Sequence, residues 1–259
     1  FGKYEDGSTS NSDGGISAYN TFSRAMSEAL EGSELTTEPA SIPSSPGVEM
    51  PELTWSAVLA DGKRVEVVAL LVDNVRTAPA SFDQRYGELS SNADLIFYNG
   101  HAGLGSNIRS LASKGHWVEG QYAIVFMNGC DTYAYVDSAL WDAHAEVNAD
   151  DPEGTRYLDI ISNALPSYFR SMPRATMALI DGLLSYEEPR TYEQIFADID
   201  SSQVVLVSGE HDNRFTPGGS TGGDTDWAGM MESATLAAGD AVNFDTGVLA
   251  AGKDVFEMD

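Results

Sequence analysis

Cysteine is almost absent from this chain, because Cys130 is the only one in 259 residues. No disulfide can form within these residues, and metal or redox motifs that need paired cysteines are excluded. A lone cysteine is most often a small buried hydrophobic residue, and that structural role is the first alternative to weigh. Here Cys130 follows an apolar run and Gly129, a position that favours a reactive thiol.

Basic residues are also scarce, with 14 Lys+Arg against 40 Asp+Glu and a formal net charge of −26. Such a surface repels nucleic acid and anionic membranes, so we expect no nucleic-acid partner. It favours cationic partners or substrates, although an acidic surface also simply keeps secreted, marine or salt-adapted proteins soluble. On composition we expect an exported protein, secreted or held in the cell envelope of a bacterium.

Long apolar runs are missing, since none approaches 18 uninterrupted residues, and no membrane insertion is expected. The first residues, Phe1 to Gly7, do not form a signal peptide. Several complete catalytic motifs are absent as well: a Gly-x-Ser-x-Gly elbow between a strand and a helix (this spacing occurs at 218–222, within the Gly- and Thr-rich loop 216–224), Gly-x-x-x-x-Gly-Lys followed by Ser or Thr (Lys253 is followed by Asp254), His-Glu-x-x-His and Cys-x-x-Cys. Their absence argues against the corresponding serine hydrolases, nucleotide-binding proteins, zinc peptidases and thiol oxidoreductases.

The chain divides by composition into three parts. Residues 1–50 form a polar leader, a candidate pro-segment, with a flexible start (1–15) and one helix predicted by apolar residues from Ile16 to Leu30. Its proline-rich stretch, 33–51, predicts a surface connector. Residues 51–232 form the main domain, and residues 233–259 form a β-leaning tail that resembles the start of a further module.

The main domain begins with predicted strands at 53–60 and 65–72, joined by an Asp61-Gly62 hairpin turn. The second of these runs is almost continuously apolar, which predicts burial on both faces. Strands and helices then alternate, which predicts an α/β fold: a mostly parallel sheet with helices on both faces and an antiparallel edge hairpin. The further predicted strands are 94–98, 122–127, 175–180 and 204–207, and the predicted helices are 82–89, 104–114, 136–147, 157–168 and 191–199.

Two of these apolar runs stop at Asn-Gly. One is followed at once by His101, and the other by Cys130. Because parallel strands end at the same edge of a sheet, both side chains should meet there. A histidine base supplies the thiolate character that a cysteine nucleophile needs. Because the strand ends at Gly129, the Cys130 N–H is free to bind an oxyanion. The small residues Ala102 and Gly103 let a second backbone N–H approach the same oxyanion.

This arrangement resembles the caspase-like cysteine peptidases, a group that includes caspases, legumains, gingipains, clostripain, metacaspases and separase. In that group the catalytic histidine follows one parallel strand and the cysteine follows the next. The resemblance covers roughly residues 64–212 and implies a caspase-like domain that cleaves peptide bonds through a Cys130–His101 dyad and a thioester acyl-enzyme. Many members are made as zymogens. The chain departs from the usual His-Gly pair, having Ala102 after the histidine, and it carries Gly129 where alanine is frequent.

The partner that the resemblance implies is a peptide or protein substrate. Members that cleave after Arg or Lys hold this P1 side chain with carboxylates, and Asp181, Asp73 and Asp131 are the candidates here. Cleavage after Asn or Asp stays open. Asp131 could instead orient His101 or cap the following helix. Trp117 lies between the two catalytic strands and is a candidate for the wall of a substrate cleft.

Two other functions remain open: a non-catalytic binding or scaffold module of the same fold, and a Cys–His amidase or acyltransferase. No cofactor is expected. Some relatives use calcium, and Asp150, Asp151 and Glu153 offer oxygen ligands, but their irregular spacing favours a solvated loop. His211, between Glu210 and Asp212, is an alternative base or metal ligand, although a surface loop is favoured. For His116 and His144 we expect structural roles, and the sequence indicates no oligomeric state.

Overall fold

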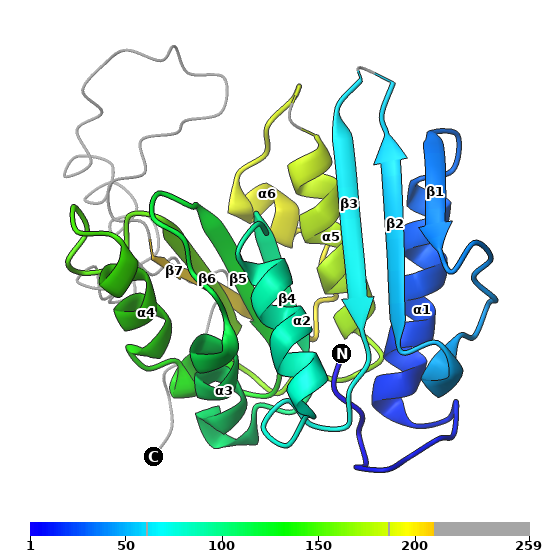
Figure 1. Ribbon diagram of the computed structural model, residues 1–259, viewed down its shortest axis with the longest axis horizontal. Helices are drawn as coiled ribbons and strands as arrows, with labels where there is room; N and C mark the ends of the chain where they lie inside the picture. Colours follow the sequence, from blue (N-terminus) through cyan, green and yellow to red (C-terminus); the bar gives the residue numbers. More distant parts are fainter. Residues whose placement is uncertain (61, 186, 210–259) are drawn as a thin grey trace.

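The computed structural model describes residues 1–60, 62–185 and 187–209 (Figure 1). The fold is α/β, with one mixed, mostly parallel sheet and one antiparallel sheet. The strands are β1 (Glu34–Glu38), β2 (Glu52–Val58), β3 (Arg64–Leu70), β4 (Leu95–Asn99), β5 (Ala123–Asn128), β6 (Leu158–Asn163) and β7 (Val205–Gly209). The helices are α1 (Gly14–Ala29), α2 (Ala80–Ser90), α3 (Ser106–Lys114), α4 (Ala139–Val147), α5 (Met172–Leu184) and α6 (Tyr192–Phe196), with short 3-10 turns η1 (Gly47–Glu49), η2 (Gly103–Gly105) and η3 (Thr132–Tyr135).

The mixed sheet has the strand order β4-β5-β6-β7. Strands β4, β5 and β6 are parallel, whereas β7 runs antiparallel to β6. Every residue of β5 and of β6 is buried, as expected for central strands covered on both faces. The carboxyl ends of β4, β5 and β6 therefore meet at one edge, together with the amino end of β7, which we call the carboxyl edge.

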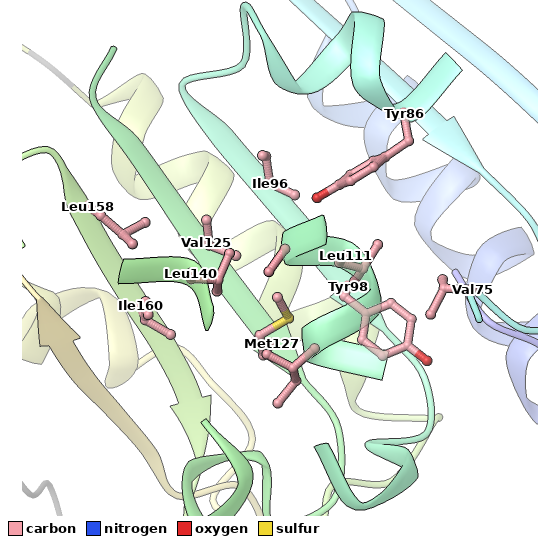
Figure 2. Packing of buried hydrophobic residues seen from close by; sticks show 12 residues of the cluster. Val75, Tyr86, Ile96, Tyr98, Leu111, Val125, Met127, Leu140, Leu158 and Ile160 are labelled. Carbon is pink, nitrogen blue, oxygen red and sulfur yellow. The ribbon is translucent and has the colours of Figure 1, made fainter. Parts of the chain in front are cut away.

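Helices cover both faces of this sheet (Figure 1). On one face α2, α3 and α4 pack through Tyr86, Leu111 and Leu140 against apolar side chains of β4, β5 and β6 (Figure 2). On the other face α5 and α6 pack against the same strands, with Leu179 and Ile195 at the centre. Burial of these apolar side chains on both faces is the main stabilising contribution to the sheet.

The antiparallel sheet, β1-β2-β3, packs against α1. Strand β2 alternates between buried and partly exposed residues, and it places Leu53 and Trp55 in the core with Tyr19 and Met26 of α1. The alternation matches a sheet with one face toward the core and one toward water. The predicted α1 and the hairpin between β2 and β3 are confirmed.

The first residues of the chain lie between the two sheets (Figure 1). Gly2 donates its N–H to Asn99 O at the end of β4, at 2.8 Å, while Lys3 N donates to Val72 O at 2.9 Å. Gly2 and Val72 form a parallel bridge. The predicted flexible start is therefore wrong for these residues, because backbone hydrogen bonds hold them on both sides.

Two predicted elements have the wrong type. Residues 158–163, predicted as helix, form strand β6, and residues 175–180, predicted as a strand, lie within helix α5. Short apolar runs do not distinguish a buried strand from a buried helix, and packing decides between them. Pro173 in the first turn of α5 suits a helix start, where its missing N–H costs no hydrogen bond.

Three further expectations are corrected by strand pairing. The polar segment 33–51, predicted as a connector, contains β1, which pairs antiparallel with β2. Strand β3 is not buried on both faces, since it belongs to the antiparallel sheet and only Ala69 within it is fully buried. The hairpin thus contributes to a separate sheet rather than to an edge of the parallel one. In the described part of the chain, no helix has both the length and the hydropathy needed to cross a bilayer.

Candidate active site

The strand register places His101 and Cys130 at equivalent points of the carboxyl edge. Asn99, the last residue of β4, pairs with Asn128, the last residue of β5. The pairing continues one step further, with Gly100 N donating to Asn128 O at 3.2 Å. His101 and Cys130 each follow their paired asparagine by two positions, so the sheet brings the two loops together as the sequence predicts.

Gly129 allows these loops to approach closely. A Cβ atom at this position would lie 2.7 Å from Gly100 O and 3.2 Å from Ala102 N. Both neighbours are backbone atoms, which cannot rotate away as a side chain would. Only glycine therefore fits here, and the Ala102 amide lies directly against the peptide that precedes Cys130.

A tight turn holds the candidate nucleophile. Gly129 N donates to Met127 O at 3.2 Å, and Asp131 N donates to Leu165 O at 3.3 Å. The Thr132 hydroxyl closes the turn by donating to Met127 O at 2.6 Å. Between these two bonded amides, the Cys130 N–H has no acceptor among the described residues. It is thus available to a substrate oxygen.

His101 is held from the side of the N-terminal segment. Its Nε2 lies 3.0 Å from Tyr4 O. A carbonyl oxygen only accepts, so in the neutral ring Nε2 carries the proton and Nδ1 carries the lone pair. The ring also packs against Tyr4 and Phe169, each with a centroid 5.2 Å away, and these two rings contact each other at 5.6 Å. These contacts leave Nδ1 as the atom that can take a proton.

Asp13 fastens the segment that carries Tyr4. Its carboxylate accepts from Tyr4 N at 3.0 Å and Glu5 N at 2.9 Å, and it also caps α1 by accepting from Gly15 N and Ile16 N. Burial raises the pKa of Asp13, but these four backbone donors lower it, and the net pKa is below the usual value. The charged carboxylate therefore links the start of α1 to the backbone that orients His101.

The loop after β6 contacts both members of the dyad. The Cys130 thiol lies 3.3 Å from Ser167 O, to which it donates. Leu165 O accepts from the N–H of Asp131, the residue that follows Cys130, and Phe169 packs on His101. Among the described residues no hydrogen bond joins Cys130 directly to His101. Catalytic hydrogen bonds are often long or misaligned until substrate binds, and rotation of the thiol about its side-chain torsion would free it from Ser167 O.

A buried polar network lies beneath the dyad, centred on Asn128, which is 0% exposed. Asn128 Oδ1 accepts from Asn163 Nδ2 at 2.8 Å, Gln203 Nε2 at 2.9 Å and Ser167 Oγ at 3.0 Å. Asn128 Nδ2 donates to Asn99 Oδ1 at 2.9 Å. The network joins the ends of β4, β5 and β6 to the segment before β7, and it holds them in one arrangement.

Backbone strain is concentrated in the same loops. In the described ranges only two residues other than glycine have a positive φ: Leu104 at 51° and Asp131 at 52°. One lies three residues after His101, and the other directly follows Cys130. Such conformations cost free energy and persist where the surrounding structure enforces them, which is common at functional sites.

The predicted substrate residues do not all lie at this edge. Asp73 pairs with Lys3, with 2.6 Å between Asp73 Oδ1 and Lys3 Nζ. Asp181 is exposed on α5 rather than at a strand end, because the run that precedes it is helical. Trp117 lies before β5, at the opposite edge, where its ring packs on His144 with the centroids 4.6 Å apart. Asp131 alone directly adjoins the dyad, and its carboxylate has no partner among the described residues.

The remaining polar candidates are engaged elsewhere. Asp150 pairs with Arg156 at 2.9 Å, and Asp151 accepts from Arg156 N at 2.8 Å. Within the described ranges no group of acidic, histidine or cysteine residues is arranged to hold a metal ion. Glu210, His211 and Asp212 lie outside the described residues.

Several site residues were not predicted from the sequence: Tyr4, Asp13, Asn163, Ser167 and Phe169. Tyr4 and Asp13 come from the predicted leader, and Asn163 and Ser167 come from the helix predicted over 157–168. Phe169 directly follows that predicted helix, and all five residues reach the dyad only through folding. A weak signal was present, since Asn99, Asn128 and Asn163 all end strands of the parallel sheet. Comparison of the chain with family models, with curated proteins and with solved structures gave no match.

Proposed function

We propose that this protein is a cysteine endopeptidase of the caspase-like type, with Cys130 as nucleophile and His101 as general acid and base. The observation that carries the proposal is the paired register of Asn99 and Asn128, which sets a thiol and an oriented imidazole at equivalent points of one sheet edge. The Cys130 N–H, which has no acceptor in the described part of the chain, and the strained loops at the same place support it.

In the proposed reaction His101 Nδ1 takes the thiol proton, and Cys130 Sγ bonds to the carbonyl carbon of the substrate. The carbonyl electron pair moves to the oxygen, which becomes an oxyanion. As this pair returns, the C–N bond breaks, and His101 donates the proton to the leaving amine. Water, deprotonated by His101, then hydrolyses the thioester and regenerates the thiol.

Two backbone amides are suited to hold the oxyanion: the N–H of Cys130 and that of Ala102. Neither has an acceptor among the described residues, and Ala102 N lies beside Gly129. Removing one such donor typically costs roughly 10²–10³-fold in kcat. Ala102 thus occupies the role that glycine has in the usual His-Gly pair, because the donor is a backbone atom.

For the P1 side chain, Asp131 is the carboxylate that adjoins the nucleophile. Asp73 is already neutralised by Lys3, and Asp181 is not at this edge. We therefore propose a basic P1 residue, held by Asp131, in keeping with the net charge of −26. An Asp131→Asn variant should lose preference for Arg and Lys while it retains the reactive thiol.

One observation favours the non-catalytic alternative: the thiol donates to Ser167 O and not to His101. Alkylation with iodoacetamide at neutral pH separates the two functions. A dyad should make Cys130 react far faster than free cysteine, and His101→Ala should abolish the difference. The matched control is His116→Ala, which removes an exposed histidine elsewhere in the chain.

A library of fluorogenic peptides varied at P1 tests the activity itself. We expect cleavage after Arg or Lys that Cys130→Ala abolishes. Activity on small amides without peptide cleavage would indicate an amidase or acyltransferase instead. A slow thiol together with no cleavage of any substrate would refute the peptidase proposal.

A further inference from the structure

Two buried asparagines each bond a carbonyl next to the dyad. Asn163, which ends β6 and is 0% exposed, donates from Nδ2 to Gly129 O at 3.1 Å. Asn107, in α3 and 2% exposed, donates from Nδ2 to His101 O, which also accepts from the Tyr98 hydroxyl at 2.8 Å. Carbonyl oxygens only accept, so the amide nitrogens must face them.

These carbonyls belong to the same peptide groups as the two free amides. Gly129 O shares a peptide plane with the Cys130 N–H, and His101 O shares one with the Ala102 N–H. Both peptides are trans, so the N–H points away from its own carbonyl. Fixing each carbonyl toward a buried asparagine therefore turns each N–H toward the opposite side, away from that asparagine.

We infer that Asn163 and Asn107 are positioning residues that preset the two donors of an oxyanion hole. Backbone hydrogen bonds hold the amides on either side of the Gly129–Cys130 peptide, whereas Asn163 holds the carbonyl of the peptide itself. Without Asn163, this peptide would lose the side-chain donor that sets its orientation. Without Asn107, the His101–Ala102 peptide would retain only the Tyr98 hydroxyl. The catalytic meaning of this arrangement rests on the proposed peptidase function, whereas the orientation of the amides does not.

Further hydrogen bonds of Asn163 and Asn107 support this positioning role. Asn163 Nδ2 also bonds Asn128 Oδ1 at 2.8 Å, and Asn107 Nδ2 also bonds the Tyr98 hydroxyl at 2.9 Å. Each amide is thus held by a second partner, which keeps it directed at the catalytic peptide. Donors fixed in this way need no reorganisation when negative charge develops on the substrate oxygen.

The test uses Asn163→Ala and Asn107→Ala, with Asn148→Ala as the matched control. Asn148 is equally buried, and it bonds Gly120 N at 2.7 Å and His144 O at 2.9 Å, remote from the dyad. Residual dipolar couplings report the orientation of single N–H bonds in solution and require no activity. We expect the Cys130 coupling to change in Asn163→Ala and the Ala102 coupling to change in Asn107→Ala, whereas Asn148→Ala leaves both unchanged.

Kinetics form the second readout. Each site variant should lose at least about tenfold in kcat on a peptide amide, with KM nearly unchanged. The iodoacetamide rate should stay within about twofold, because displacement of iodide creates no oxyanion. If an alanine variant does not fold, the isosteric variants Asn163→Asp and Asn107→Asp replace it in both measurements.

Unchanged couplings in both site variants would overturn the inference, whatever the activity. A wild-type protein that cleaves no substrate and has a slow thiol would refute the proposed function instead. In that case the couplings still decide whether the two asparagines orient the amides.

Discussion

His144 should make the protein less stable in acid. Its side chain is 1% exposed, and neither ring nitrogen has a hydrogen-bond partner among the described residues. Burial lowers the pKa of His144 from 6.5 to about 4, and the nearby Asp151 offsets this only in part. The folded state therefore keeps this histidine neutral, whereas the unfolded chain binds a proton at pH 6.5 and below.

The magnitude follows from the two pKa values. Above pH 6.5 the histidine is neutral in both states and stability does not depend on it. Between pH 6.5 and pH 4 the unfolded state gains the proton first, and stability falls as the pH falls. The full loss below pH 4 is about 3 kcal/mol, since each pKa unit corresponds to about 1.4 kcal/mol.

The assay is urea unfolding at pH 7 and pH 4.5 for the wild type and His144→Leu. Other groups also titrate in this range, so the difference between the two proteins is the relevant quantity. The wild type should lose about 2–3 kcal/mol more than the variant between the two pH values. The control His116→Leu removes an exposed histidine, and its free energy of unfolding should fall by as much as that of the wild type between the two pH values. Equal losses in the wild type and His144→Leu would refute the account.

Three further predictions concern the site. Gly129→Ala should lower the free energy of unfolding by about 1–3 kcal/mol and remove most of the activity, because its Cβ would lie 2.7 Å from the backbone oxygen of Gly100. The control Gly182→Ala, whose Cβ would meet the Ile195 side chain, should lower stability alone. Thermal unfolding and peptide cleavage assays compare the two variants. Asp13→Ala should lower the free energy of unfolding by about 0.5–2 kcal/mol, because a helix cap is lost. It should also lower kcat, because Asp13 no longer holds the Tyr4 backbone, and an unchanged kcat would contradict that role. Phe169→Ala should slow alkylation of Cys130 by freeing the His101 ring, and a rate equal to wild type would show that the packing is not needed.

Some elements of the fold follow directly from local sequence. Strands β4 and β5 are apolar runs that end at Asn-Gly, and helix α1 has apolar residues at helical spacing, so each is predicted in its correct type. In contrast, β6 and part of α5 are short apolar runs whose type depends on their neighbours. Residue Asp159 in β6 illustrates the difficulty, because a carboxyl group in a fully buried strand needs polar partners, and the hydroxyls of Tyr122 and Tyr192 that donate to it come from outside the strand.

The candidate site divides in the same way. The sequence by itself determined that a lone cysteine and a histidine follow successive strands, with small residues beside them, because side-chain type and chain order are local facts. Only the tertiary structure decided how they are held: Tyr4 O on His101, Ser167 O at the thiol, and Asn163 on the peptide before Cys130. Such hydrogen bonds join residues far apart in the chain, so they depend on packing and leave no periodic pattern in the sequence.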